Sequence, residues 1–107
     1  MAIDKSHSKY NKLITVSNPS KVIQNANNYL GKGKYELFIS DNKDKKYMII
    51  TPDNKKVHFG SIAYEDYTKH NDDIRRKSYL ARASNIKGDW KNNKYSPNLL
   101  SQNLLWM

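Results

Sequence analysis

The spacing of apolar side chains in the middle of the chain predicts a small antiparallel sheet. In residues 35–40, the apolar side chains of Tyr35, Leu37 and Ile39 alternate with the residues at 36, 38 and 40, which is typical of a strand with one buried face. Residues 47–50 form a continuous apolar run, as expected of a central strand covered on both faces. Val57 and Phe59 again alternate with polar residues, and a glycine follows them. Polar turns at 41–45 and 52–54 separate these segments, so we predict a three-stranded antiparallel meander.

Helix signals flank this sheet on both sides. Asn18-Pro19 is typical of a helix start, apolar residues follow at helical spacing, and Gly31 is a natural stop. A second helix is predicted over residues 72–84, because acidic side chains at its start favour the positive end of the helix dipole. Ser96-Pro97 predicts a third helix that runs to the C-terminus. A loop over residues 85–94 connects the last two helices.

The N-terminal part of the chain carries weaker signals. Residues 1–11 are polar and lack periodicity, which predicts a flexible basic arm. Residues 12–17 contain three large aliphatic side chains, enough for a short strand. We therefore expect residues 12–107 to form a single small α+β domain, with helices packed on one face of the sheet.

The predicted C-terminal helix has one broad apolar face. On a helical wheel its large apolar side chains share one arc, and polar side chains lie on the opposite side. The apolar side chains are Leu99, Leu100, Leu104 and Trp106. We expect Leu99, Leu104 and Trp106 to be buried against the sheet.

Length and composition exclude several classes of protein. With 107 residues, of which 37% are hydrophobic, the chain can bury one modest core. It contains no apolar run long enough to span a bilayer, and the N-terminus lacks the apolar stretch of a secretory signal, which predicts that it is not secreted. The absence of cysteine excludes disulfides and cysteine zinc sites. The Gly-Lys repeat at 31–34 lacks the spacing of a phosphate loop, and we predict no cofactor.

The charge balance indicates a polyanionic partner. Nineteen Lys and Arg against ten Asp and Glu give a net charge of +9. The charge is concentrated towards the N-terminus, because residues 1–34 hold six lysines and one acidic residue. Lysines attract phosphate without reading base sequence. The candidate phosphate contacts in this region are Lys5, Lys9, Lys12, Lys32 and Lys34.

The helix over residues 72–84 carries a second candidate contact. Arg75, Tyr79 and Arg82 fall within a narrow sector at helical spacing, with Arg76 beside them. Guanidinium groups bind phosphate in a forked geometry, and tyrosine stacks on exposed bases. In the alternative interpretation Tyr79 packs on the sheet, and the arginines pair with nearby aspartates. Those aspartates are Asp66, Asp72 and Asp73. Four tyrosines without periodic placement are further candidates for surface contacts: Tyr10, Tyr64, Tyr67 and Tyr95.

The histidines allow a catalytic hypothesis. Asp66 and His70 lie four residues apart, a spacing that brings both side chains to one helical face, and His58 could complete a set of metal ligands. Such a set suits metal-dependent cleavage of phosphodiesters. The alternative is structural: His70 ends a helix, and His58 is a surface residue of a strand.

A series of short motifs resembles a known family. In order they are Lys46-Tyr47, His58-Phe59-Gly60, the run from Tyr64 to His70, Arg75-Arg76, Tyr79-Leu80, Arg82 and Leu104-Leu105-Trp106. This series, over residues 46–107, resembles short basic proteins encoded by large DNA viruses of eukaryotes. Members of that family often carry His after the last arginine, where this chain has Ala83. The resemblance implies a viral origin and adds no known activity.

These observations favour a small, basic, non-enzymatic viral protein. It would be associated with the virion or act inside the infected host cell, and it would bind nucleic acid, DNA rather than RNA, largely through phosphate contacts. One alternative is a minor capsid or assembly protein whose partners are viral structural proteins. A second alternative is the metal-dependent nuclease.

Overall fold

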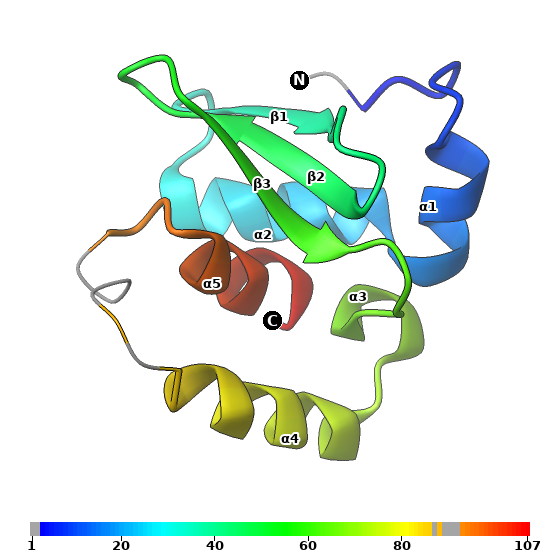
Figure 1. The fold of residues 1–107 in the computed structure, drawn as a ribbon, viewed down its shortest axis with the longest axis vertical. Coiled ribbons are helices and arrows are strands. Elements are labelled where there is room, and N and C mark those ends of the chain that lie inside the picture. Colours follow the sequence, from blue (N-terminus) through cyan, green and yellow to red (C-terminus); the bar gives the residue numbers. More distant parts are fainter. Residues whose placement is uncertain (1–2, 87, 89–92) are drawn as a thin grey trace.

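The computed structural model describes residues 3–86, 88 and 93–107. Its elements are α1 (Tyr10–Val16), α2 (Pro19–Leu30), β1 (Glu36–Ile39), β2 (Lys45–Ile50), β3 (Lys56–Ser61), α3 (Tyr67–His70), α4 (Asp73–Ser84) and α5 (Pro97–Leu100), which continues as a π-helical segment, Ser101–Leu105. The sheet lies over α2 and α5, and α4 lies apart from it (Figure 1). The predicted α+β fold, a three-stranded antiparallel sheet with helices packed against it, is confirmed. Within the described part of the chain, no helix is long and apolar enough to cross a membrane.

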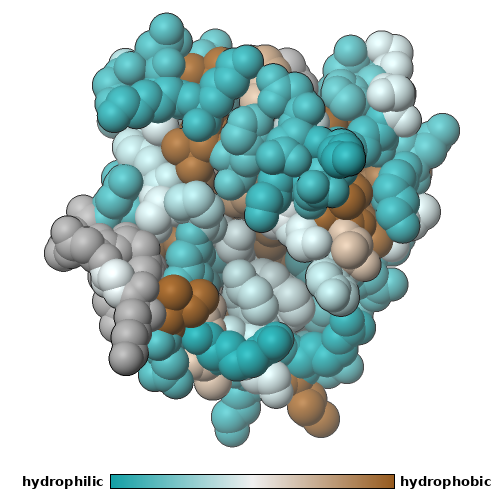
Figure 2. All heavy atoms as spheres, viewed as in Figure 1, coloured by the Kyte–Doolittle hydropathy of each residue, from teal (hydrophilic) through white to brown (hydrophobic). Residues whose placement is uncertain are grey.

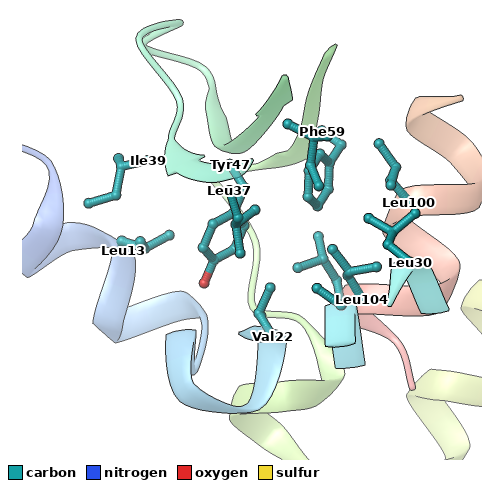
Figure 3. Packing of buried hydrophobic residues seen from close by; sticks show 12 residues of the cluster. Leu13, Val22, Leu30, Leu37, Ile39, Tyr47, Phe59, Leu100 and Leu104 are labelled. Atoms are coloured by element: carbon teal, nitrogen blue, oxygen red, sulfur yellow. The ribbon is translucent and has the colours of Figure 1, made fainter. Parts of the chain in front are cut away.

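The inner face of the sheet forms one wall of the hydrophobic core. β2 is the central strand, and Tyr47 lies opposite Ile39 on β1 and Phe59 on β3. The rings of Tyr47 and Phe59 stack with their centroids 5.9 Å apart. Leucines from the helices fill the space below the sheet (Figure 3).

The outer face of the sheet is only partly covered. Met48 of β2 lies between Phe38 and His58 of the neighbouring strands, and all three side chains are half-buried. The expected cover on both faces of residues 47–50 is thus complete for Tyr47 and Ile49 and partial for Met48 and Ile50. Met48 and Ile50 point away from the core, and their apolar surface is shielded in part by cross-strand neighbours rather than by a second layer of helices.

The segment predicted as a strand over residues 12–17 is helical. Leu13 and Val16 lie three residues apart, which places both on one face of α1, and they are 0% and 7% exposed. The β-branched residues in this stretch favour a strand by propensity, but burial of that helical face against the core outweighs propensity. α1 begins at Tyr10, inside the segment expected to be a flexible arm, and Ile3 also packs against the core. Residues 1 and 2 of that arm lie outside the described residues.

The predicted limits of two helices are confirmed. The side chain of Asn18 accepts a hydrogen bond from the Lys21 amide at the start of α2, and Gly31 ends that helix at a φ of +97°. α4 coincides with the helix expected over residues 72–84. Of the connecting loop expected over 85–94, residues 87 and 89–92 lie outside the described part.

The C-terminal segment packs against α2 and against β3. Leu100, Leu104 and Leu105 are fully buried, so the prediction for Leu104 is confirmed. Leu99 and Trp106 are only half-buried, and the ring of Trp106 stacks on Tyr79 of α4 rather than on the sheet. β3 approaches this segment closely at Gly60, where a Cβ atom would lie 2.7 Å from Leu105 Cδ1.

Candidate functional site

The start of α4 is fixed by its own aspartates. Asp72 Oδ1 accepts hydrogen bonds from the amides of Ile74 and Arg75, at 3.0 and 3.2 Å. Asp73 accepts a hydrogen bond from the Tyr67 hydroxyl at 2.6 Å. Both carboxylates are therefore engaged in local structure. Among the described residues, Arg75 pairs instead with Glu65, and the distance from its guanidinium nitrogen to the carboxylate oxygen is long, 3.8 Å.

One face of α4 is attached to the C-terminus of the chain. The rings of Tyr79 and Trp106 stack with centroids 4.2 Å apart and planes within 9° of parallel. Arg76 Nε donates a 2.7 Å hydrogen bond to the Trp106 carbonyl, and its guanidinium lies 5.5 Å from the centre of the Tyr67 ring. Arg76 and Tyr79 thus hold α4 in place. Of the predicted Arg75–Tyr79–Arg82 ridge, only the two arginines are exposed.

A groove runs between α4, the ends of β2 and β3, and the C-terminal segment. We call it the α4 groove; its volume is about 670 Å³. Its lining includes Lys45, Tyr64, Ile74, Arg75, Arg82 and Trp106. Figure 2 shows an area of intermediate hydropathy between α4 and the sheet, pale against a mostly hydrophilic surface. Two large apolar side chains are open to solvent here, since Tyr64 is 70% and Ile74 80% exposed.

A buried ion pair lies beside the groove. Lys46 Nζ lies 3.1 Å from Asp66 Oδ2, and both side chains are almost fully buried. Burial lowers the pKa of the Lys46 ammonium, and the charge of Asp66 opposes that shift. The second oxygen of Asp66 accepts a hydrogen bond from the Thr68 hydroxyl. Asp66 is thus fully engaged within the fold and does not neutralise Arg75 or Arg82.

Lys9, a predicted phosphate contact, stabilises the β1–β2 turn. Its ammonium donates hydrogen bonds to the carbonyls of Ser40, Asn42 and Lys45, at 2.7, 2.9 and 2.6 Å. These three bonds use all the donors that a lysine possesses. Burial lowers the pKa of Lys9, although Asp41 and Asp44 favour its charged form. In this conformation Lys9 has no donor left for phosphate.

We expect Lys9→Met to lower the free energy of unfolding by about 1–3 kcal/mol, because hydrogen bonds to a charged group are lost and three carbonyls lose a partner. Chemical denaturation followed by circular dichroism measures this change. Lys12→Met is the matched control, since Lys12 is exposed on α1 and its replacement is expected to leave stability within about 0.5 kcal/mol. Equal stability of the two variants would contradict the structural role of Lys9.

The other predicted phosphate contacts are exposed and lie on separate parts of the surface. Lys12 is on α1, and Arg75 and Arg82 are on α4. Lys32 and Lys34 follow α2, and Lys5 precedes α1. The structure does not bring these six side chains into one cluster.

The residues of the catalytic hypothesis are not assembled. The described residues include no group of three or more histidine, aspartate or glutamate side chains placed to hold a metal ion. Asp66 pairs with Lys46, and His58 Nδ1 lies 2.7 Å from Ser40 Oγ at the sheet. His70 Nδ1 accepts a hydrogen bond from the Asp72 amide, and its ring packs 5.2 Å from that of Trp106. The structure therefore does not bring His58, Asp66 and His70 together as a set of metal ligands.

His70 is a structural residue at the end of α3. Burial lowers its pKa, and the nearby charge of Arg75 lowers the pKa further. Because its Nδ1 accepts a hydrogen bond, the proton of the neutral ring lies on Nε2, which is buried and makes no hydrogen bond with the described residues. The structural alternative stated for His70 therefore accounts for its position.

The sequence did not indicate four residues of the α4 groove as a group: Lys45, Tyr64, Ile74 and Trp106. Tyr64 was expected only as a general surface contact, and its exposure agrees with that expectation. Ile74 carried a usable signal, because it is a large aliphatic residue among charged ones in the first turn of a helix. Lys45 and Trp106 come from distant parts of the chain, so no local pattern joins them.

Comparison with known families gives one match. Residues 35–83 match the model of a family of unknown function (DUF5754). The matched segment contains the whole sheet, α3 and all of α4 except its last residue. The chain has no match among curated proteins or solved structures.

Proposed function

We propose that this protein is a small, non-enzymatic, basic protein that binds nucleic acid mainly through phosphate contacts. The observation that supports it is the net charge of +9, with six of the nine predicted contact residues exposed. A polyanion gains affinity from such a surface by releasing counterions, without a base-specific site. DNA is the proposed nucleic acid, and we further propose a viral origin and a place in the virion or the infected cell.

The two exposed arginines of α4 lie on one helix and line the same groove. Arg75 and Arg82 project from a helix that is capped and attached through Arg76 and Tyr79. A cation on a rigid element loses less conformational freedom on binding than one on a loose segment. Arg75 and Arg82 are therefore proposed as the main phosphate contacts, with Lys5, Lys12, Lys32 and Lys34 adding long-range attraction.

We expect Arg75→Ala with Arg82→Ala to weaken binding to a random-sequence duplex severalfold and to reduce the salt slope of log K by about 1–2. Fluorescence anisotropy of labelled DNA over a salt series measures both quantities. The matched control is Lys55→Ala with Lys56→Ala, which removes the same charge from a site where both lysines pair with aspartates. RNA of the same length tests the preference for DNA.

The outcome also distinguishes the assembly alternative, which the exposed Tyr64 and Ile74 favour as protein-contact residues. If neither DNA nor RNA binds at micromolar protein and low salt, nucleic-acid binding is refuted. Binding that is independent of salt would refute the phosphate mechanism. Equal losses in the arginine and lysine variants would show that net charge, not α4, determines affinity.

A further inference from the structure

The α4 groove has the size and lining of a site for one planar group. Its volume of about 670 Å³ is within the range of about 300–1,000 Å³ typical of small-ligand sites. Tyr64, Ile74 and Trp106 give it apolar surface, and two of these side chains are mostly exposed. A duplex buries the faces of its bases by stacking, so only an unpaired base can use such a surface.

The charge of the groove favours an anionic occupant. Arg75 and Arg82 are seven residues apart on α4, a distance of about 10 Å along the helix axis at about 1.5 Å per residue. Lys45 and Lys46 also line the groove, and the ammonium of Lys46 is paired with Asp66. The acidic residue of the lining is Glu65, whose carboxylate is 3.8 Å from Arg75 with both side chains about half exposed. Such an exposed pair is weak and can yield Arg75 to a phosphate.

We propose that the α4 groove binds one unpaired base of a single-stranded nucleic acid, with the flanking phosphates on Arg75 and Arg82. This inference rests on the proposed function and adds a preference for single strands. Tyr64 is the stacking residue. Tyr79, the stacking residue expected from the sequence, has one ring face covered by Trp106.

An acidic peptide satisfies only part of this lining. Its carboxylates would bind the two arginines but would leave the exposed ring of Tyr64 without a planar partner. A nucleotide provides both the anion and the flat apolar face, and stacking on an aromatic ring tolerates any base. The combination of Tyr64 with two guanidiniums therefore favours the nucleotide.

The first experiment compares Tyr64→Ala with the unmodified chain on a labelled single strand and on a duplex of equal length. We expect single-strand affinity to fall by roughly 5- to 150-fold, the usual effect of removing one stacking ring, and duplex affinity to change by less than about twofold. Tyr64→Phe is the matched control and should retain single-strand binding. Because Tyr64 is 70% exposed, its replacement is not expected to affect folding, which a thermal melt checks.

The second experiment observes the groove directly. The chain has two tryptophans, so Trp90→Phe leaves Trp106 as the sole tryptophan fluorophore. An unlabelled single strand is expected to quench Trp106 emission in a saturable manner, and a duplex at the same phosphate concentration to quench it less. Poly-L-glutamate of matched charge serves as the peptide probe.

The outcomes separate this inference from the proposed function. If single strand and duplex both bind but Tyr64→Ala weakens neither, or weakens both equally, phosphate binding stands and the base site is refuted. Equal quenching of Trp106 by poly-L-glutamate would assign the groove to an acidic protein instead. If neither nucleic acid binds, the proposed function fails and the base site with it.

Discussion

Replacement of Asp66 by alanine is expected to lower the free energy of unfolding by about 3–5 kcal/mol. Asp66 is 0% exposed, and its carboxylate lies 3.1 Å from the ammonium of Lys46, which is 2% exposed. Removing Asp66 leaves that ammonium buried without a counter-charge, because the fold gives Lys46 little access to water. The free energy of unfolding of a native domain is about 5–15 kcal/mol, so this loss is a large fraction of the total stability.

The effect extends beyond one ion pair, because Asp66 belongs to a buried polar network. Thr68, which donates to Asp66, accepts a hydrogen bond from the Asn18 amide at 3.0 Å. The Ser17 hydroxyl lies 2.8 Å from the Tyr47 hydroxyl and 3.3 Å from that of Thr68. The network thereby joins the α1–α2 junction, the central strand and α3. Its polar groups satisfy one another, and loss of one member leaves others without partners.

Two variants test this explanation by chemical denaturation. Asp53→Ala removes a carboxylate from an exposed pair, Lys55–Asp53, whose side chains are 77% and 65% exposed, and is expected to cost less than about 1 kcal/mol. Lys46→Met combined with Asp66→Ala should recover part of the loss, because no isolated charge remains. A stability of Asp66→Ala within about 1 kcal/mol of the unmodified chain would show that the pair contributes little.

The sheet and two helices could be predicted because their signals are local. The alternation around Leu37 and Phe59 is a property of neighbouring residues, and so are the Asn18 cap and the Gly31 stop of α2. The segment over residues 12–17 could not be assigned in this way. A short apolar run fits both a strand and a helix, and the choice is made by the core against which it packs.

The candidate site was predicted less well, since charge in a sequence does not reveal its acceptors. Lys9 donates to carbonyls 31, 33 and 36 residues away, and Arg76 to a carbonyl 30 residues away. Tyr79 likewise finds its stacking partner at the other end of the fold. These contacts depend on how distant segments meet, so helical spacing predicted the exposed Arg75 and Arg82 but not the structural roles beside them.

Deletion of residues 99–107 is expected to abolish the cooperative unfolding transition. The segment contributes three leucines that are 0–1% exposed: Leu100, Leu104 and Leu105. Each buried side chain of this size is worth about 1.5–3 kcal/mol, so their sum approaches the whole stability of a small domain. The deletion also leaves the Asn25 amide group without the Leu104 carbonyl, to which it donates a 2.9 Å hydrogen bond from the buried face of α2.

The same deletion removes the attachment of α4. Without Trp106, Arg76 loses its 2.7 Å carbonyl acceptor and Tyr79 loses its stacked ring. Far-ultraviolet circular dichroism with thermal melts measures both losses, and removal of Met107 alone, which is 47% exposed, is the matched control and should change the melting temperature little. An unchanged melting temperature after deletion of 99–107 would contradict the packing described for this segment. A cooperative thermal transition that persists with reduced helix content would show that the C-terminal segment stabilises α4 rather than the core.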